Sequence, residues 1–410
     1  MTTYTPSVRN SRCRFSEVRL RRGNGTNSDK RCRGNPMKIV IFGLSITSSW
    51  GNGHATTFRA LCQALRERGH RIVFFEKNVE WYASNRDLPE PQFCTVRLYE
   101  DWDAILPTVR AELRSADVAM LGSYFPDGIA AAEEIFDSPV RAKTYYDIDT
   151  PITVAALRER DATDYLQKAQ VPGFDIYFSF TGGPMLRELE SRFGAQRAYP
   201  LYCSFDPDEY RRFGVNQRFA CDLSYMGTYA PDRQPKIEEL LCKPATMLLR
   251  RKFIVAGPQY PKTITWPANV KRIFHLNPRW HARFYSSSRF TLNVTRRDMV
   301  QAGYSPSVRL FEAAACGAAI ISDNWPGLDS FFTPGREILL PADHRDVLHF
   351  ITDLSEEEIE RIGLAAQERV LAEHTSQRRA QQFEDQIMKV LAVHRSPAVA
   401  SECEPLAKAP

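Results

Sequence analysis

An apolar strand, a glycine turn, an amphipathic helix and another apolar strand follow one another in both halves of this 410-residue chain. The first series runs from residues 37–43 (MKIVIFG), through a helix that Gly69 ends, to residues 72–75. The second begins at residues 222–226 (DLSYM). Buried apolar strands joined by helices are typical of βαβ units and parallel sheets. The sequence therefore predicts an α/β fold with two Rossmann-like domains facing each other across a cleft.

The alternation of strands and helices continues through each half and sets the expected boundaries. Further apolar runs predict strands at residues 118–121, 140–145, 176–180, 197–202, 253–256, 289–294 and 318–321. A long last helix is expected at about 375–392. The predicted segments are an extension (1–36), an N-terminal domain (37–204), a C-terminal domain (205–392) and a flexible tail (393–410).

Charge is distributed unevenly along the chain. The formal net charge is +5, but residues 1–36 alone contribute eight Arg and one Lys against one Glu and one Asp, which leaves −2 for the rest. We expect this extension to be disordered. It is either a basic tail that binds an anionic surface or carries a targeting signal, or a product of a gene model whose true start codon is Met37. The remaining chain does not have the basic composition of a nucleic-acid binder, so no nucleic-acid partner is predicted.

Cysteine spacing and hydropathy indicate the compartment. The nine cysteines are scattered without a Cys-x-x-Cys pair, which argues against a zinc site and a disulfide framework. No apolar run approaches the roughly 18 residues of a membrane span, so no transmembrane segment is expected. These features predict a cytoplasmic protein.

Residues 302–330 (AGYSPSVRLFEAAACGAAIISDNWPGLDS) predict a loop, a helix, a tight turn and a strand. Ser305 is the expected N-cap, Pro306 the first helical residue and Gly317 the left-handed end. A helix start attracts anions through free N–H groups. Glu312 lies too deep to cap the helix, and its carboxylate can accept two hydroxyls. Phosphate at the helix start and ribose at Glu312 would together describe a nucleoside diphosphate.

This segment resembles the donor-binding segment of GT-B glycosyltransferases of the "group 1" (family 4-like) type, most of all the CgeB-like branch. A Glu-x7-Glu motif crosses it in that superfamily; Glu312 matches the second Glu, which holds ribose, and Tyr304 stands at the first. The resemblance covers residues 37–392. It implies a hexosyltransferase-type enzyme that uses a nucleotide-sugar co-substrate without a further cofactor, and a final helix that crosses back onto the first domain.

Two further strand ends in the second half carry candidate donor-binding residues. In the first, Gly227 and Thr228 form a turn before a helix that Pro231 is expected to open. Arg233 can donate two parallel hydrogen bonds to a diphosphate. The resemblance implies that Arg233, with Lys236 one turn on, neutralises the leaving group. Arg296 follows the second strand end. The helix start would add backbone N–H groups of Ser305, Ser307 and Val308, and the long loop from Gly257 to His275 is expected to reach the nucleotide base.

The first half offers an acceptor-side loop. Gly51, Asn52 and Gly53 follow the first strand and allow close approach to a sugar, and His54 begins the next helix. The loop is not Gly-x-Gly-x-x-Gly, so it does not indicate a pyrophosphate clamp. His54 is a candidate catalytic or sugar-contacting group.

Asp147 and Asp149 at the end of a later strand are candidate catalytic carboxylates. An inverting reaction needs a base for the acceptor proton, and these two or His54 could supply it. A retaining reaction, which the family likeness suggests, needs no dedicated base. Alternatively, Asp149 or Thr150 caps the next helix. We predict no metal site, because so short an Asp-x-Asp motif is common by chance.

Other functions remain open on sequence alone. A non-catalytic nucleotide-sugar sensor or scaffold would fit the loss of the first motif Glu at Tyr304. An NAD(P)-linked oxidoreductase is less favoured, although Glu76 ends a strand where an acid can hold ribose. A phosphorylase is disfavoured because no lysine context for pyridoxal phosphate is visible. The base, the sugar, the acceptor, the stereochemistry and the oligomeric state do not follow from the sequence.

Overall fold

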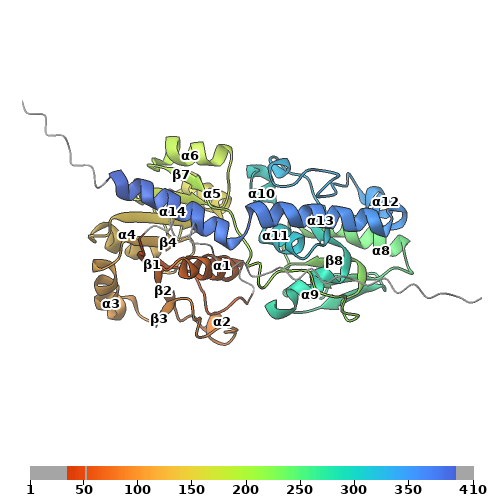
Figure 1. The fold of residues 1–410 in the computed structure, drawn as a ribbon, viewed down its shortest axis with the longest axis horizontal. Helices are drawn as coiled ribbons and strands as arrows, with labels where there is room; N and C mark the ends of the chain where they lie inside the picture. Colours follow the sequence, from red (N-terminus) through yellow and green to blue (C-terminus); the bar gives the residue numbers. More distant parts are fainter. Residues whose placement is uncertain (1–34, 51–52, 394–410) are drawn as a thin grey trace, which may run out of the picture. The chain divides into compact units, whose positions relative to one another are not determined.

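The computed structural model describes residues 35–50 and 53–393. The predicted extension and tail fall almost entirely outside these ranges, as do Gly51 and Asn52 of the predicted acceptor loop. Figure 1 shows the two sheets and the helices around them.

A parallel sheet of seven strands forms the first lobe, in the order β3-β2-β1-β4-β5-β6-β7. Its strands are β1 (Lys38–Phe42), β2 (Arg71–Lys77), β3 (Thr95–Tyr99), β4 (Val118–Gly122), β5 (Ala142–Asp147), β6 (Ile176–Ser179) and β7 (Ala198–Pro200). Val40 and Phe42 pack into one core, whereas Ile39 and Ile41 pack into another. Alternate side chains of one strand point to opposite faces, so both faces of this sheet are covered.

Helices connect these strands and cover the two faces. They are α1 (Gly53–Glu67), α2 (Glu80–Ala83), α3 (Trp102–Arg114), α4 (Gly128–Phe136), α5 (Thr150–Arg160), the 3₁₀ helix Lys168–Gly173 and α6 (Pro184–Phe193). The N-cap of α3 is Asp101, whose carboxylate accepts from the backbone N–H of Ala104 at 2.8 Å. Such a cap satisfies one of the free amides of the first turn.

A parallel sheet of five strands forms the second lobe, in the order β10-β9-β8-β11-β12. Its strands are β8 (Cys221–Met226), β9 (Phe253–Ala256), β10 (Val270–Ile273), β11 (Ser288–Asn293) and β12 (Ala319–Ser322). Its helices are α7 (Gln234–Ile237), the π-helix Glu238–Cys242, α8 (Lys243–Met247), the 3₁₀ helix Pro278–Trp280, α9 (His281–Ser286), α10 (Arg297–Ala302), α11 (Val308–Ala315), the 3₁₀ helix Leu328–Ser330, α12 (His344–Asp353) and α13 (Glu356–Glu373). The predicted fold class, with two parallel Rossmann-like sheets, is therefore confirmed. The expected division after residue 204 falls between β7 and β8.

The last helix, α14 (Ser376–Val393), leaves the second lobe and packs on the first (Figure 1). Phe383 and Ile387 join the core that holds Ile39 and Ile41. Glu384 accepts a hydrogen bond from His70 Nε2 at 2.6 Å and also pairs with Arg68 of the first lobe. The predicted return of the final helix to the first domain is thus confirmed. No described helix is long and apolar enough to cross a membrane.

Candidate functional site

A pocket of about 660 Å³ is lined by residues of both lobes, and most of the predicted site residues line it. In parallel α/β sheets, ligands bind at the carboxyl ends of the strands, and the loops after β1, β5, β8 and β11 contribute here. The predicted residues that line the pocket are Gly53, His54, Asp149, Gly227, Thr228, Arg233, Arg296, Ser305, Ser307, Val308 and Glu312. Asp147 and Lys236 do not line it.

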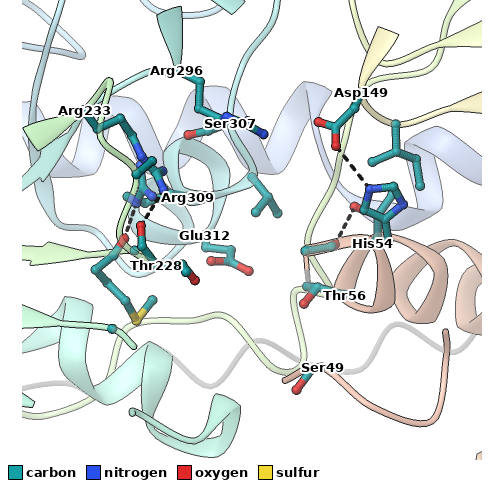
Figure 2. Close-up of a pocket in the computed structure, with 18 of the residues that line it drawn as sticks. Ser49, His54, Thr56, Asp149, Thr228, Arg233, Arg296, Ser307, Arg309 and Glu312 are labelled. Atoms are coloured by element: carbon teal, nitrogen blue, oxygen red, sulfur yellow. Dashed lines mark hydrogen bonds and ion pairs between the residues drawn. The ribbon is translucent and has the colours of Figure 1, made fainter. Parts of the chain in front are cut away.

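Glu312 lies on α11 and points into the middle of the pocket (Figure 2). Its side chain is 4% exposed. Burial raises the pKa of the Glu312 carboxyl to about 7, although the hydroxyls of Tyr210 and Tyr285 and the guanidinium of Arg309 lower it. A buried carboxylate facing an open cavity is able to accept hydroxyl hydrogen bonds from a ligand.

Three arginines line the second-lobe side of this pocket: Arg233, Arg296 and Arg309. Arg233 Nη2 donates to the carbonyl of Thr228 at 2.5 Å, and its Nε is buried without a hydrogen-bond partner among the described residues. Burial lowers the pKa of the Arg233 guanidinium, and the other two arginines lower it further. None of the three forms an ion pair with a described carboxylate, so this wall is suited to an anion.

Arg309 is a site residue that the sequence analysis missed. It lies one turn before Glu312 and is 9% exposed. Its Nε donates to the Met226 carbonyl at 2.5 Å and its Nη1 to Asn293 Oδ1 at 2.8 Å. A buried arginine held by two neutral acceptors is not ion-paired, so its charge can also act on a ligand.

Asn293, at the end of β11, also went unpredicted. Its Oδ1 accepts from Arg309 and from Ser307 Oγ, both at 2.8 Å. Its Nδ2 donates to Ser322 Oγ at 2.9 Å, which fixes the orientation of the amide. Asn293 thereby ties the arginine to the residue that precedes α11.

The start of α11 differs from the prediction. The helix begins at Val308 with Ser307 at the N-cap position, so Ser305 is not the N-cap and Pro306 is not the first helical residue. Ser305 Oγ instead accepts from Thr181 Oγ1 at 2.9 Å. Because Ser307 Oγ donates to Asn293, no side chain caps α11 among the described residues. Its first amides thus remain available beside the arginines.

Two other second-lobe predictions need correction. The helix after β8 begins at Gln234, not at Pro231, so Arg233 stands at the N-cap position. Lys236, which was expected to act with Arg233, is exposed and lies outside the pocket lining. Gly257 and His275 of the predicted base loop line the pocket, whereas Trp266 packs against the guanidinium of Arg272.

His54 and Asp149 face each other on the first-lobe wall (Figure 2). His54 Nε2 lies 3.4 Å from Asp149 Oδ2, and the His54 ring meets Tyr124 edge-on at 5.3 Å between centroids. Tyr124 has a φ of +63°, a conformation rare for residues other than glycine. Asp149 occupies the N-cap position of α5 but makes no side-chain cap, so its carboxylate is directed to the pocket.

Asp147 does not fit the catalytic role predicted for it. It is fully buried, and its carboxylate accepts from Tyr177 Oη at 2.5 Å and Thr153 Oγ1 at 3.0 Å. Burial raises the pKa of this carboxyl to about 6. Asp147 and Asp149 therefore face different surroundings. No group of three or more His, Cys, Asp or Glu side chains that could hold a metal occurs among the described residues.

Glu76, the basis of the oxidoreductase alternative, is occupied within the protein. Its Oε1 accepts from the hydroxyls of Ser45 and Thr47 at 3.1 and 2.5 Å. Its Oε2 accepts from the backbone N–H groups of Ile46 and Thr47 at 2.6 and 3.0 Å. The carboxylate holds the loop after β1 and has no free face for a ribose.

Residues 233–385 match the family described as "Glycosyl transferase-like". No curated protein matches the chain.

Solved structures that resemble the chain include a sucrose-phosphate synthase from Thermosynechococcus elongatus, with 13% identity, coverage of 87% of this chain and 100% of that one, and a TM-score of 0.61. Anabaena HepE in complex with UDP and glucose shows 12% identity, coverage of 86% and 100%, and a TM-score of 0.61. An alpha-glucosyltransferase in complex with UDP-glucose and DNA containing an abasic site shows 13% identity, coverage of 86% of this chain and 100% of that one, and a TM-score of 0.64. The likeness establishes the fold, and with the family match it supports the GT-B glycosyltransferase superfamily; the CgeB-like branch stays a prediction.

Proposed function

We propose that the protein is a glycosyltransferase that moves a sugar from a nucleotide-diphosphate sugar to a hydroxyl acceptor. One observation carries this proposal: three arginines that pair with no described carboxylate, a helix start that no described side chain caps, and a buried carboxylate line the same pocket. Cations and free amides suit a diphosphate, and a carboxylate one turn along the helix suits a ribose. The family match over this lobe agrees with that assignment.

Charge stabilisation by the protein itself would drive departure of the nucleoside diphosphate. Arg233 and Arg309 are already desolvated and oriented, so they can neutralise developing phosphate charge without reorganising. The amides at the start of α11 would add to this stabilisation. We therefore propose a metal-independent reaction with the nucleotide sugar as its co-substrate and no further cofactor.

His54 and Asp149 would act on the acceptor. The carboxylate of Asp149 faces His54 Nε2, so it can orient the imidazole and stabilise its protonated form. An acceptor hydroxyl bound beside this pair could give its proton to Asp149 or His54 as its oxygen bonds to the sugar and the bond between the sugar and the nucleoside diphosphate breaks. Gly53 gives the ligand close access to the same wall.

The first-lobe wall favours an uncharged acceptor. Among its described lining residues are hydroxyls and two tyrosines, Tyr82 and Tyr124, but no Arg or Lys. Arg59, on the neighbouring helix face, is held by Asp87 at 2.8 and 2.9 Å. No Arg or Lys among these lining residues would pair with an anionic acceptor, so we propose a neutral hydroxyl compound as the acceptor.

A turnover assay tests the proposal. The full chain is incubated with UDP-, GDP-, ADP- and dTDP-sugars, with and without neutral sugars, and nucleoside diphosphate release is measured. We expect release that depends on one nucleotide and falls in Asp149→Asn. Nucleotide-sugar binding without release across many acceptors would instead favour the sensor or scaffold. A cytoplasmic location is also proposed, and cell fractionation tests it.

A further inference from the structure

Tyr304, in the loop between α10 and α11, has a backbone conformation that tyrosine rarely adopts, with φ at +48°. Its N–H donates to the carbonyl of Pro326 at 2.7 Å. Its carbonyl accepts from the N–H of Gly182, in the first lobe, at 2.9 Å. The residue is therefore held in a strained conformation by both lobes.

The ring of Tyr304 fills a slot between two glycines. A Cβ on Gly183 of the first lobe would lie 2.3 Å from Tyr304 Cδ2, and a Cβ on Gly327 of the second lobe would lie 2.5 Å from Cδ1. Both glycines have positive φ, +61° and +86°. No other residue type would leave room for the ring at these two positions.

The residue after Tyr304 is also bonded to the first lobe. Ser305 Oγ accepts from Thr181 Oγ1 at 2.9 Å, and the carbonyl of Pro306 accepts from Cys203 Sγ at 3.5 Å, in the segment between β7 and β8. Ser305 and Pro306 line the pocket and lead directly to the start of α11. The position of the first lobe and the position of this pocket loop are therefore linked through residues 304–306.

We propose that Tyr304 is a positioning residue that fastens the pocket loop to the first lobe, and so aligns the start of α11 with the acceptor wall. Its ring does not line the pocket, and its hydroxyl makes no hydrogen bond with the described residues. Tyr304, which stands at the first glutamate position of the Glu-x7-Glu motif, thus makes a contact between the lobes. The catalytic consequence rests on the proposed function; the contact between the lobes does not.

Two pairs of variants in the full chain test the proposal. Tyr304→Ala removes the ring and Tyr304→Phe keeps it. Gly183→Ala drives a methyl into the ring, whereas Gly335→Ala imposes a similar backbone strain at φ +77° with no atom within 4 Å of the new methyl. Melting temperatures establish that each variant is folded.

Hydrogen exchange followed by mass spectrometry reads the contact itself, through the peptide that contains the Gly182 amide. We expect exchange there to quicken by about tenfold in Tyr304→Ala and Gly183→Ala, and to match wild type in the other two variants. Wild-type exchange in Tyr304→Ala would overturn the proposal.

Kinetics separate positioning from ligand contact. In Tyr304→Ala we expect kcat for nucleoside diphosphate release to fall by about tenfold or more, the Kd for the nucleoside diphosphate to change by less than about threefold, and Tyr304→Phe to behave as wild type. An equal loss of kcat in Tyr304→Phe, or tighter sugar-nucleotide binding in Tyr304→Glu, would contradict the positioning role of the ring. If wild type binds no nucleoside diphosphate, the proposed function fails and the exchange result alone decides this proposal.

Discussion

Replacing Glu312 with glutamine should stabilise the empty protein at alkaline pH while weakening its binding of donor. Burial raises the pKa of the Glu312 carboxyl to about 7 in the folded protein, from an ordinary glutamate value of 4.5. Because the folded pKa is the higher one, the free energy of unfolding falls as the pH rises from about 4.5 through about 7. At 1.36 kcal/mol for each pKa unit, ionising Glu312 lowers the free energy of unfolding by roughly 3 kcal/mol relative to the protonated form.

Glutamine carries no charge at either pH, so it should abolish this part of the pH dependence. Between pH 5 and pH 8, the stability of Glu312→Gln relative to wild type should rise by roughly 2–3 kcal/mol. Denaturant unfolding of both proteins at the two pH values measures it. If the free energy of unfolding changed with pH by the same amount in wild type and variant, the reasoning would be refuted, because Glu312 would then titrate as it does in the unfolded chain.

The same pKa predicts how donor binding depends on pH. A ribose hydroxyl donates to the ionised carboxylate, so affinity should increase between pH 6 and pH 8 as Glu312 loses its proton. Calorimetry in two buffers of different ionisation enthalpy should detect proton release on binding. Binding that does not depend on pH and releases no proton would contradict the ribose assignment.

Three further substitutions test separate parts of the account. Arg309→Met should weaken nucleoside diphosphate binding by roughly 10- to 100-fold, because the ligand loses a charged hydrogen-bonding partner. Arg289 is paired with a carboxylate, so Arg289→Met should leave the calorimetric Kd unchanged. Asp149→Asn should lower kcat by about 10²-fold or more with little change in that Kd, in steady-state kinetics; a change confined to the Kd would place Asp149 in donor binding. Glu76→Gln should lower the free energy of unfolding by roughly 2–4 kcal/mol in denaturant melts, because two of its four hydrogen bonds need a second acceptor oxygen, and an unchanged midpoint would refute this.

The fold could be predicted because its central strands are continuous apolar runs between turns. β1, β4 and β8 are buried along nearly their whole length, and such segments stand out in a sequence. β3 was not predicted, because it is a half-exposed edge strand (TVRLY) without a clear alternation. The helix that follows it, α3, contains Pro107, which weakens a helical pattern.

Parts of the site could be located because they follow strand ends. Asp149 lies directly after the end of β5, Arg233 and His54 lie in or just after the longer loops that follow β8 and β1, and Glu312 lies in the helix that follows another loop. Arg309 was not distinguishable, because a buried arginine and a surface arginine look the same in a helical sequence. Its burial depends on Asn293, a contact between residues 16 positions apart.

The helix start at 305–308 was misplaced for a different reason. Ser305 and Ser307 both have the side chain of an N-cap, and Pro306 favours Ser305, because proline fits the first position of a helix. Tertiary contacts decide between them, because the hydroxyl of Ser305 accepts from Thr181, which lies 124 residues away in the sequence. Local sequence carries no signal for that partner.

The most direct test of the donor site is calorimetric titration of the full chain with UDP, GDP, ADP, CDP and dTDP and their sugars. Wild type, Glu312→Gln and Glu337→Gln are compared, the last being a buried carboxylate of the same lobe outside the pocket. We predict selective binding of one nucleoside diphosphate and its sugars, lost in Glu312→Gln and retained in Glu337→Gln. Equal binding in all three proteins, or none in folded wild type, would contradict the assignment of this pocket to a nucleotide sugar.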